Sequence, residues 1–167
     1  ITSGDLFIDI DGDAQYGPAN RRSGSGYTTV QNSFGYDYVF DLDFDSMSYT
    51  VFSLNQATTT TVYYRQNDES NPWRYESGGE EILDGTIGYI TGLTDQETGF
   101  TGGYHNAVTV DLSFLGDNVD FIAHFTMGCG NDNLMGQGTT SAVPEPATFA
   151  LVGIGLLFLG RLGRKAA

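Results

Sequence analysis

The chain has 167 residues, which is enough for one domain with a single hydrophobic core. Acidic residues outnumber basic ones by 21 to 7 and the net charge is −14, so the phosphate backbone of a nucleic acid would repel the protein, and we exclude nucleic-acid binding. The hydrophobic share of 40% and the aromatic share of 13% exclude a chain that is acidic because it is disordered. A single cysteine excludes an intramolecular disulfide.

Acidic residues alternate near the start of the chain. The first residue is Ile1, as expected if an export signal has been removed, although a fragment of a longer chain would begin in the same way. Asp9, Asp11 and Asp13 follow the pattern of the first half of a calcium loop, where oxygen ligands converge from alternate positions. The second half departs from it, with Ala14 and Asn20 where an EF-hand has glycine and an acidic residue. The three aspartates are thus candidate calcium ligands, although only the first half of a calcium loop is present.

Short segments of alternating apolar and polar residues follow one another along the chain and predict strands. The segments are 6–10, 36–45, 48–54, 60–64, 74–77, 86–91, 107–112 and 119–126. Turn-forming residues separate them, and no long segment before residue 147 has a helical period. The sequence thus predicts an all-β fold, an antiparallel β-sandwich or jelly-roll-like domain over residues 1–135. Residues 12–35 are expected to form a long exposed loop, and residues 136–142 a linker.

Two groups of side chains in the middle of the chain are candidates for a site. Trp73 and Tyr75 would suit a sugar ring if they were exposed, although aromatic residues in the core of a sandwich explain them equally well. Glu80 and Glu81 would suit the acid and base of a hydrolase, but their glycine-rich surroundings favour a solvated loop. No nucleophile motif or zinc-protease motif is present. We expect no catalytic residues and no enzymatic activity.

Three consecutive segments make up the C-terminal end. Val143, Pro144, Glu145 and Pro146 form an extended joint that is open to a protease. The uncharged run 147–160 predicts an apolar helix that would span about 21 Å of a hydrocarbon core about 30 Å thick. The basic end consists of Arg161, Arg164 and Lys165, and it marks the cytoplasmic side by the positive-inside bias. The folded part is therefore expected outside the cytoplasm, with the tail in the inner membrane.

This arrangement over residues 143–167 resembles the PEP-CTERM sorting signal of bacterial surface proteins. The upstream segment His124–Asp132 is similar to the H-x-T-M-x-C-G-N-D segment that often precedes such a tail. The resemblance implies that an exosortase, a membrane protease of the transpeptidase type, recognises the proline motif and removes the helix. It also implies a protein that is transiently anchored in the membrane and is then displayed on the cell surface or released.

Together these features predict a non-catalytic structural protein of the cell surface or extracellular matrix. Assembly into filaments is a sharper form of this hypothesis, in which residues 1–10 add as a strand to the sheet of another copy and the apolar tail is buried between subunits. The alternative is a carbohydrate-binding module of the exopolysaccharide matrix. Calcium is the one cofactor that the sequence suggests.

Overall fold

The computed structural model describes residues 3–17, 26–63, 70–127 and 133–141. Within these ranges the chain forms strands, one single-turn α-helix and one 3-10 helix. The strands are β1 (Ser3–Asp9), β2 (Tyr27–Gln31), β3 (Tyr38–Asp43), β4 (Ser48–Ser53), β5 (Thr59–Tyr63), β6 (Arg74–Ser77), β7 (Glu80–Thr86), β8 (Gly88–Leu93), β9 (His105–Thr109), β10 (Asp120–Met127) and β11 (Asn133–Thr139). The helices are α1 (Asp95–Thr98) and η1 (Ser113–Leu115). The prediction of an all-β domain is confirmed, and the predicted apolar helix lies outside the described residues.

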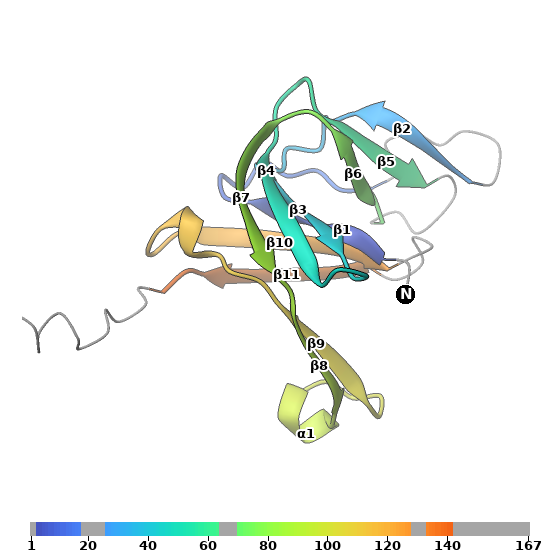
Figure 1. Ribbon diagram of the computed structural model, residues 1–167, viewed down its shortest axis with the longest axis vertical. Coiled ribbons are helices and arrows are strands. Elements are labelled where there is room, and N and C mark those ends of the chain that lie inside the picture. The colour runs from blue at the N-terminus through green and yellow to red at the C-terminus, as the bar shows by residue number, and fades with distance from the viewer. Residues whose placement is uncertain (1–2, 18–25, 64–69, 128–132, 142–167) are drawn as a thin grey trace, which may run out of the picture.

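The described strands form three antiparallel sheets. A six-stranded sheet has the order β11-β10-β1-β3-β4-β7, a three-stranded sheet the order β2-β5-β6, and a hairpin pairs β8 with β9. The three-stranded sheet lies over one face of the large sheet, as Figure 1 shows, and the two sheets share one hydrophobic cluster. This two-layer arrangement agrees with the predicted sandwich.

Both faces of the large sheet are buried at its centre. Alternation in β1 and β3 directs Phe7 and Val39 to the three-stranded sheet, where they pack with Val62. Ile8 and Phe40 point to the opposite face. There the segment that contains η1 covers them, and the Phe114 ring lies 5.9 Å from that of Phe40. A strand with both faces covered carries apolar residues in succession, as Leu6 to Ile8 do.

A buried carboxylate joins the two layers of the sandwich. The side chain of Asp5 in β1 accepts hydrogen bonds from the backbone N–H of Leu42 at 3.0 Å and of Tyr75 at 2.8 Å. Its own N–H donates to the carbonyl of Trp73 at 2.9 Å. Asp5 is 1% exposed, and this burial raises its pKa to about 7, with the nearby Asp41 carboxylate adding to the rise. Asp5 is thus the polar connection between β1, β3 and β6.

The structure corrects the predicted role of the N-terminal segment. β1 lies inside the large sheet, where Phe7 pairs with His124 of β10 on one side and with Val39 of β3 on the other. Both of its edges are therefore occupied within the same molecule. Residues 3–9 cannot add to the sheet of another copy without leaving their own, so the predicted donor strand is wrong.

Three strands lie where the sequence predicts loops or a linker. β2 occupies part of the loop predicted over 12–35, because Val30 packs into the core and the other residues pair with β5. β7 replaces the solvated loop expected around Glu80 and Glu81, because it pairs with β4 and Leu83 packs against the core. β11 takes residues 136–139 out of the predicted linker, since each of its residues pairs with β10. These three segments form strands because they pair with neighbouring strands, and amino-acid composition does not reveal such pairing.

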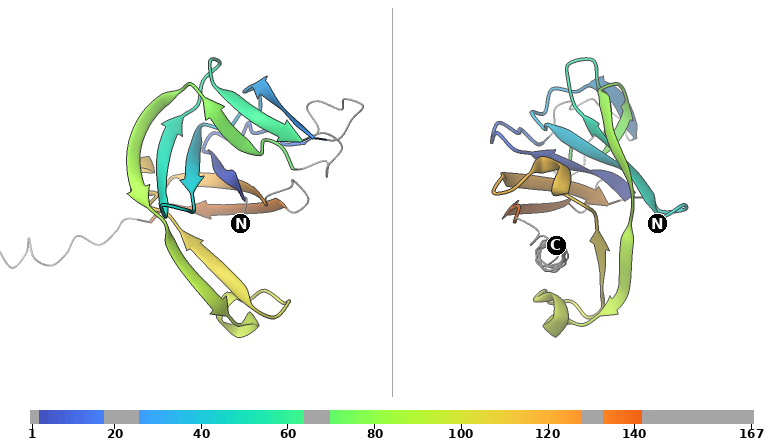
Figure 2. Two further views of the ribbon diagram at one scale, coloured as in Figure 1. Left: turned by 45° about the vertical axis from the view of Figure 1, so that its right-hand side comes forward. Right: turned by 60° about the vertical axis from the view of Figure 1, so that its left-hand side comes forward.

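The β8–β9 hairpin, with α1 at its tip, forms an arm that stands away from the sandwich (Figures 1 and 2). We define the arm as residues 88–109. Its base contacts the body through Tyr89, whose ring is 6.4 Å from that of Phe44. Further out, Ile90, Phe100 and Tyr104 are 53%, 69% and 84% exposed. The arm therefore holds its shape mainly through its own contacts.

Candidate functional site

The three predicted ligand residues come together at the end of β1. Asp9 is the last residue of the strand, and Asp11 and Asp13 lie in the turn that follows. One carboxylate oxygen from each residue lies within 4.8 Å of the other two. Asp9 is buried, whereas Asp11 and Asp13 are exposed. The structure thus brings together the set of oxygens that the sequence suggests.

Backbone hydrogen bonds to carboxylates shape the acidic turn. Oδ1 of Asp9 accepts the N–H groups of Asp11 at 3.1 Å and Gly12 at 2.8 Å, and its Oδ2 accepts that of Ala14 at 3.2 Å. Asp13 N–H donates to Oδ1 of Asp11 at 3.2 Å. Short acidic side chains favour such turns because they accept bonds from the backbone two or three residues on. A carboxylate oxygen has two lone pairs, so the two bonds to Oδ1 of Asp9 use both of its lone pairs. Oδ2 of Asp9 and Oδ1 of Asp11 each accept one of these bonds and keep a lone pair for a cation.

A fourth carboxylate, Asp37, reaches the same place from the segment before β3. Its Oδ2 accepts the N–H of Ile10 at 2.7 Å, and its own N–H donates to the carbonyl of Ile8 at 2.9 Å. Gly35 has a φ of 80° and lies directly against Asp13, where a Cβ would meet the carboxylate. Asp37 thus lies beside the three aspartates, and the sequence did not predict this because only the β1–β3 pairing brings it there.

The pKa values of two of these carboxyl groups are raised, for different main reasons. The pKa of Asp13 is raised, chiefly by the neighbouring Asp11 carboxylate. The pKa of Asp37 is raised chiefly by burial, and Asp9, Asp11 and Asp13 add to the rise. Like charges at short range disfavour the ionised form, and a cation held between them would reverse this effect. The arrangement suits a hard divalent cation such as Ca²⁺, which prefers carboxylate oxygens.

A groove of about 570 Å³ runs beside the acidic turn. Asp9 and Asp11 line one side, and Asp120 and Thr139 line the other, from the facing ends of β10 and β11. Thr139 Oγ1 donates to Asp120 Oδ1 at 2.6 Å. The groove gives solvent ions a path to the turn, and its walls are rich in oxygen acceptors.

Of the two residues of the predicted sugar platform, Trp73 is buried and Tyr75 is partly exposed. Trp73 is 5% exposed, with the Tyr27 ring 5.7 Å away and the Arg74 guanidinium 5.3 Å from its ring centroid. Tyr75 stacks on Phe52 at 4.5 Å, and its hydroxyl donates to the carbonyl of Gly78. Flat rings bury large apolar areas, and the interface between the two sheets uses these rings for that purpose. Trp73 therefore lacks the exposure that a sugar platform needs, and Tyr75 is packed on Phe52 with part of its ring exposed.

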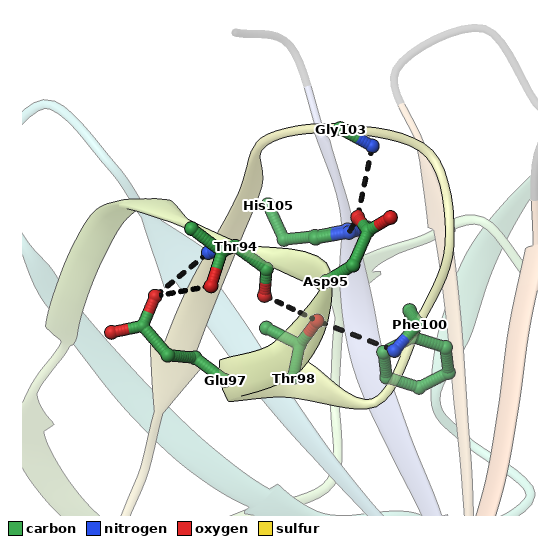
Figure 3. A network of polar contacts seen from close by, with 7 residues as sticks. All are labelled: Thr94, Asp95, Glu97, Thr98, Phe100, Gly103 and His105. Carbon is green, nitrogen blue, oxygen red and sulfur yellow. Dashed lines mark hydrogen bonds and ion pairs between the residues drawn. The ribbon is translucent and has the colours of Figure 1, made fainter.

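The most exposed aromatic side chains lie instead on the arm, whose tip is ordered by a local network (Figure 3). The Asp95 carboxylate accepts the N–H of Gly103 at 2.9 Å and lies 2.8 Å from Nε2 of His105. The pKa of Asp95 is lowered, with the hydrogen bond to His105 as the largest cause. This pair joins the start of α1 to the start of β9 and closes the tip.

A capping box sets the start of α1. The Glu97 carboxylate accepts both the N–H and the hydroxyl of Thr94 at 2.8 Å. Gly99 ends the helix in the left-handed conformation, with a φ of 75°. The sequence analysis did not single out any residue of this tip. The pattern of threonine with glutamate three residues later was the signal that could have located it.

Comparison with known families places one segment of the chain. Residues 142–165 match the model of the PEP-CTERM protein-sorting motif. The resemblance drawn from the proline, apolar and basic segments is therefore confirmed. A PEP-CTERM motif implies an exported, surface-sorted protein that is associated with the membrane before an exosortase, a membrane enzyme, processes it.

The body of the chain has no such match. No curated protein and no solved structure is significantly similar to the chain. None of the helices within the described residues is long and apolar enough to cross a membrane. Residues 143–146 and the basic end at Arg161, Arg164 and Lys165 lie outside the described residues. Of the upstream segment, His124 to Met127 belong to β10, and residues 128–132 lie outside as well.

Proposed function

We propose that this chain is a non-catalytic structural protein of the cell surface or extracellular matrix, delivered by exosortase processing. The PEP-CTERM motif at residues 142–165 carries the proposal. The position of the motif supports it, because β11 ends at Thr139 and the motif begins at residue 142. Cleavage at the proline motif would therefore remove the tail without cutting any strand of the sandwich.

The fold supports a structural role in a second way. Apolar side chains fill both faces of the large sheet, and the Asp5 carboxylate joins its two layers through buried hydrogen bonds. A module whose core is packed in this way is rigid, as a structural role requires. Trp73 and Tyr75 lie in the interface between the sheets, so nothing in their placement favours the carbohydrate-binding alternative.

The test follows the full chain in its producing cells. Surface and membrane fractions are separated, and the intact mass of the protein in each fraction is measured. We expect the surface fraction to hold a form shortened near Pro146 and the membrane fraction to hold the full-length form. Replacing both Pro144 and Pro146 with alanine should trap the protein in the membrane fraction.

A matched control replaces Pro18, a proline outside the motif, with alanine, and this variant should be sorted as the unchanged chain is. Normal surface delivery of the variant that lacks both motif prolines would contradict the proposal. A different outcome is that the purified protein hydrolyses a polysaccharide or a peptide, and loses this activity when Glu80 or Glu81 is replaced with glutamine. That result would contradict the proposal that the protein is non-catalytic.

We also propose that Asp9, Asp11 and Asp13 bind Ca²⁺. The convergence of their oxygens within 4.8 Å and the mutual repulsion that raises the pKa of Asp13 support this proposal. Bound calcium would fix the turn after β1 and the segment of Asp37 that packs against it. Its role would be to stabilise an exported domain.

The calcium proposal is tested by thermal unfolding and calorimetry on the full chain after treatment with a chelator. We expect added Ca²⁺ to raise Tm and Mg²⁺ to raise it less, because Mg²⁺ demands stricter geometry. Replacing Asp11 and Asp13 with asparagine should abolish the rise, whereas replacing the exposed Asp117 with asparagine should not. No binding heat and no shift of Tm would overturn calcium binding while leaving the sorting role intact.

A further inference from the structure

The two edges of the six-stranded sheet differ in charge. β7 forms one edge and carries Glu80, Glu81 and Asp84, all exposed. β11 forms the other edge with the sequence NLMGQGT, which contains neither a charged residue nor a proline. Among the described residues, only β10 pairs with β11. Exposed edges are usually protected by charges or proline, and β11 has no such protection.

Apolar side chains are exposed on this same edge. Leu134 is 62% exposed and Met135 is 38% exposed. Leu134 is on the same face of the sheet as Phe125, its partner in β10, and Gly138 is on that face opposite Phe121. The Phe121 ring lies over Gly138, where a Cβ would meet it at 2.8 Å. The edge thus presents a protruding leucine near one end and a glycine beneath an aromatic ring near the other.

The exposed leucine of one copy is complementary in shape to the glycine beneath the aromatic ring of a second copy. We propose that β11 pairs with β11 of a second copy of this chain, antiparallel and about a twofold axis at Gly136, so that the two six-stranded sheets become continuous. Leu134 of each copy then faces Gly138 of the other and contacts the Phe121 ring beside it. Met135 faces Gln137, and Gly136 faces its own counterpart.

The distribution of charge favours β11 as the edge through which two copies make contact. The chain carries a net charge of −14, so most surfaces of two copies repel each other at short range. β11 is a strand of seven residues without charge, where backbone groups can pair with no like charges opposed. Pairing of β11 with the acidic β7 edge would gain no opposite charge. The contact is therefore isologous and closes at a dimer, whereas a β11–β7 contact would propagate into a filament.

This pairing makes a second copy of the chain the partner in the structural role proposed above, and its biological relevance rests on that proposed function. Its geometry can be tested independently of sorting. In an antiparallel pair, directly opposed Cα atoms lie about 4.5–5.5 Å apart, which is within the range of a disulfide. A Cβ added at Gly136 meets no atom within 4 Å, so a cysteine fits there. Residues two positions off register lie beyond the limit of about 7 Å.

The experiment uses the full chain in mild detergent with Cys129, the single cysteine, replaced by serine. Gly136→Cys is added, the protein is oxidised gently, and dimers are counted on non-reducing gels. We expect a disulfide-linked dimer as the main product. Gln137→Cys, which is off register, and Ile82→Cys on β7, which is 42% exposed, should each give at least fivefold less dimer.

A second change tests the role of charge at the edge. Met135→Lys added to Gly136→Cys should reduce the yield of dimer severalfold, because the two lysines would be diagonal neighbours across the pair and their long side chains would bring like charges within reach of each other. Circular dichroism of each variant checks that it is folded. Equal crosslinking at positions 136, 137 and 82, or none at 136 in folded protein, would overturn the pairing. Surface delivery is measured separately, so either result leaves the proposed sorting role open to its own test.

Discussion

The sandwich and the arm are stabilised by different kinds of interaction. In the sandwich, side chains such as Phe40 and Val51 are fully buried, and buried polar groups such as Asp5 bond to the backbone of distant strands. In the arm, Phe100 and Tyr104 are largely exposed, and the order of the tip depends on short-range bonds such as that between Asp95 and His105. An isolated two-stranded hairpin is marginal in water, so the arm should open locally while the sandwich unfolds as a unit.

The largest expected effect is the difference in unfolding free energy between removing a buried side chain of the sandwich and removing an exposed one of the arm. Phe40→Ala removes a side chain that is 0% exposed and should lower the free energy of unfolding by about 3–5 kcal/mol. Tyr104→Ala removes one that is 84% exposed and should change the free energy by no more than about 0.5 kcal/mol. Urea unfolding of the two variants measures both. Similar losses would mean that the arm is part of the cooperative unit.

The next largest effect concerns the carboxylate between the layers. Asp5→Ala leaves the N–H groups of Leu42 and Tyr75 buried without their acceptor, and it should cost about 2–4 kcal/mol. Asp117→Ala serves as the matched control, because that carboxylate is exposed, and should be nearly neutral. Equal stability of the two variants in urea would show that the two sheets do not depend on Asp5.

The same residue gives the sandwich a distinct dependence on pH. Burial raises the pKa of Asp5 to about 7, whereas an aspartate in an unfolded chain titrates near 3.9. Between these values the folded state binds more protons than the unfolded state, so this contribution is full below about pH 4 and is lost as the pH rises through about 7.

Unfolding free energies between pH 4.5 and 8 test this dependence. Asp13 and Asp37 also have raised pKa values and add to the slope, so the difference between the unchanged chain and Asp5→Asn isolates Asp5. Asp41 and Arg74 are the charged neighbours that modify it. If that difference did not vary with pH, the carboxyl group would not titrate in this range.

The smallest expected effect is confined to the arm. His105→Ala removes the main group that lowers the pKa of Asp95, and the tip should open more often. Because the folded pKa of Asp95 is depressed, its contribution is present above about pH 4 and is lost as the pH falls through the folded value. Amide exchange should accelerate over residues 95–105, and the global free energy should change by about 0.5 kcal/mol or less. Unchanged exchange would show that the tip does not need this pair.

Alternation predicted the strands whose side chains divide clearly between a buried and an exposed face. It succeeded for β4, where Tyr49 and Val51 mark the buried positions. It failed for β2 and β11, whose threonines and glycines carry little apolar signal and which are held by pairing to β5 and β10. Sequence reasoning brought Asp9, Asp11 and Asp13 together but not Asp37, because β1 and β3 become neighbours only when the sheet forms.

The sequence by itself determined the features that depend on residues adjacent in the chain. These are the sorting motif at residues 142–165, the acidic turn at Asp9 to Asp13, and the all-β character. Only the tertiary structure decided that Trp73 is buried, that Asp5 joins two sheets, and that β11 is an uncharged edge. The physical reason is that burial and strand order arise from contacts between residues far apart in sequence, which local composition does not encode.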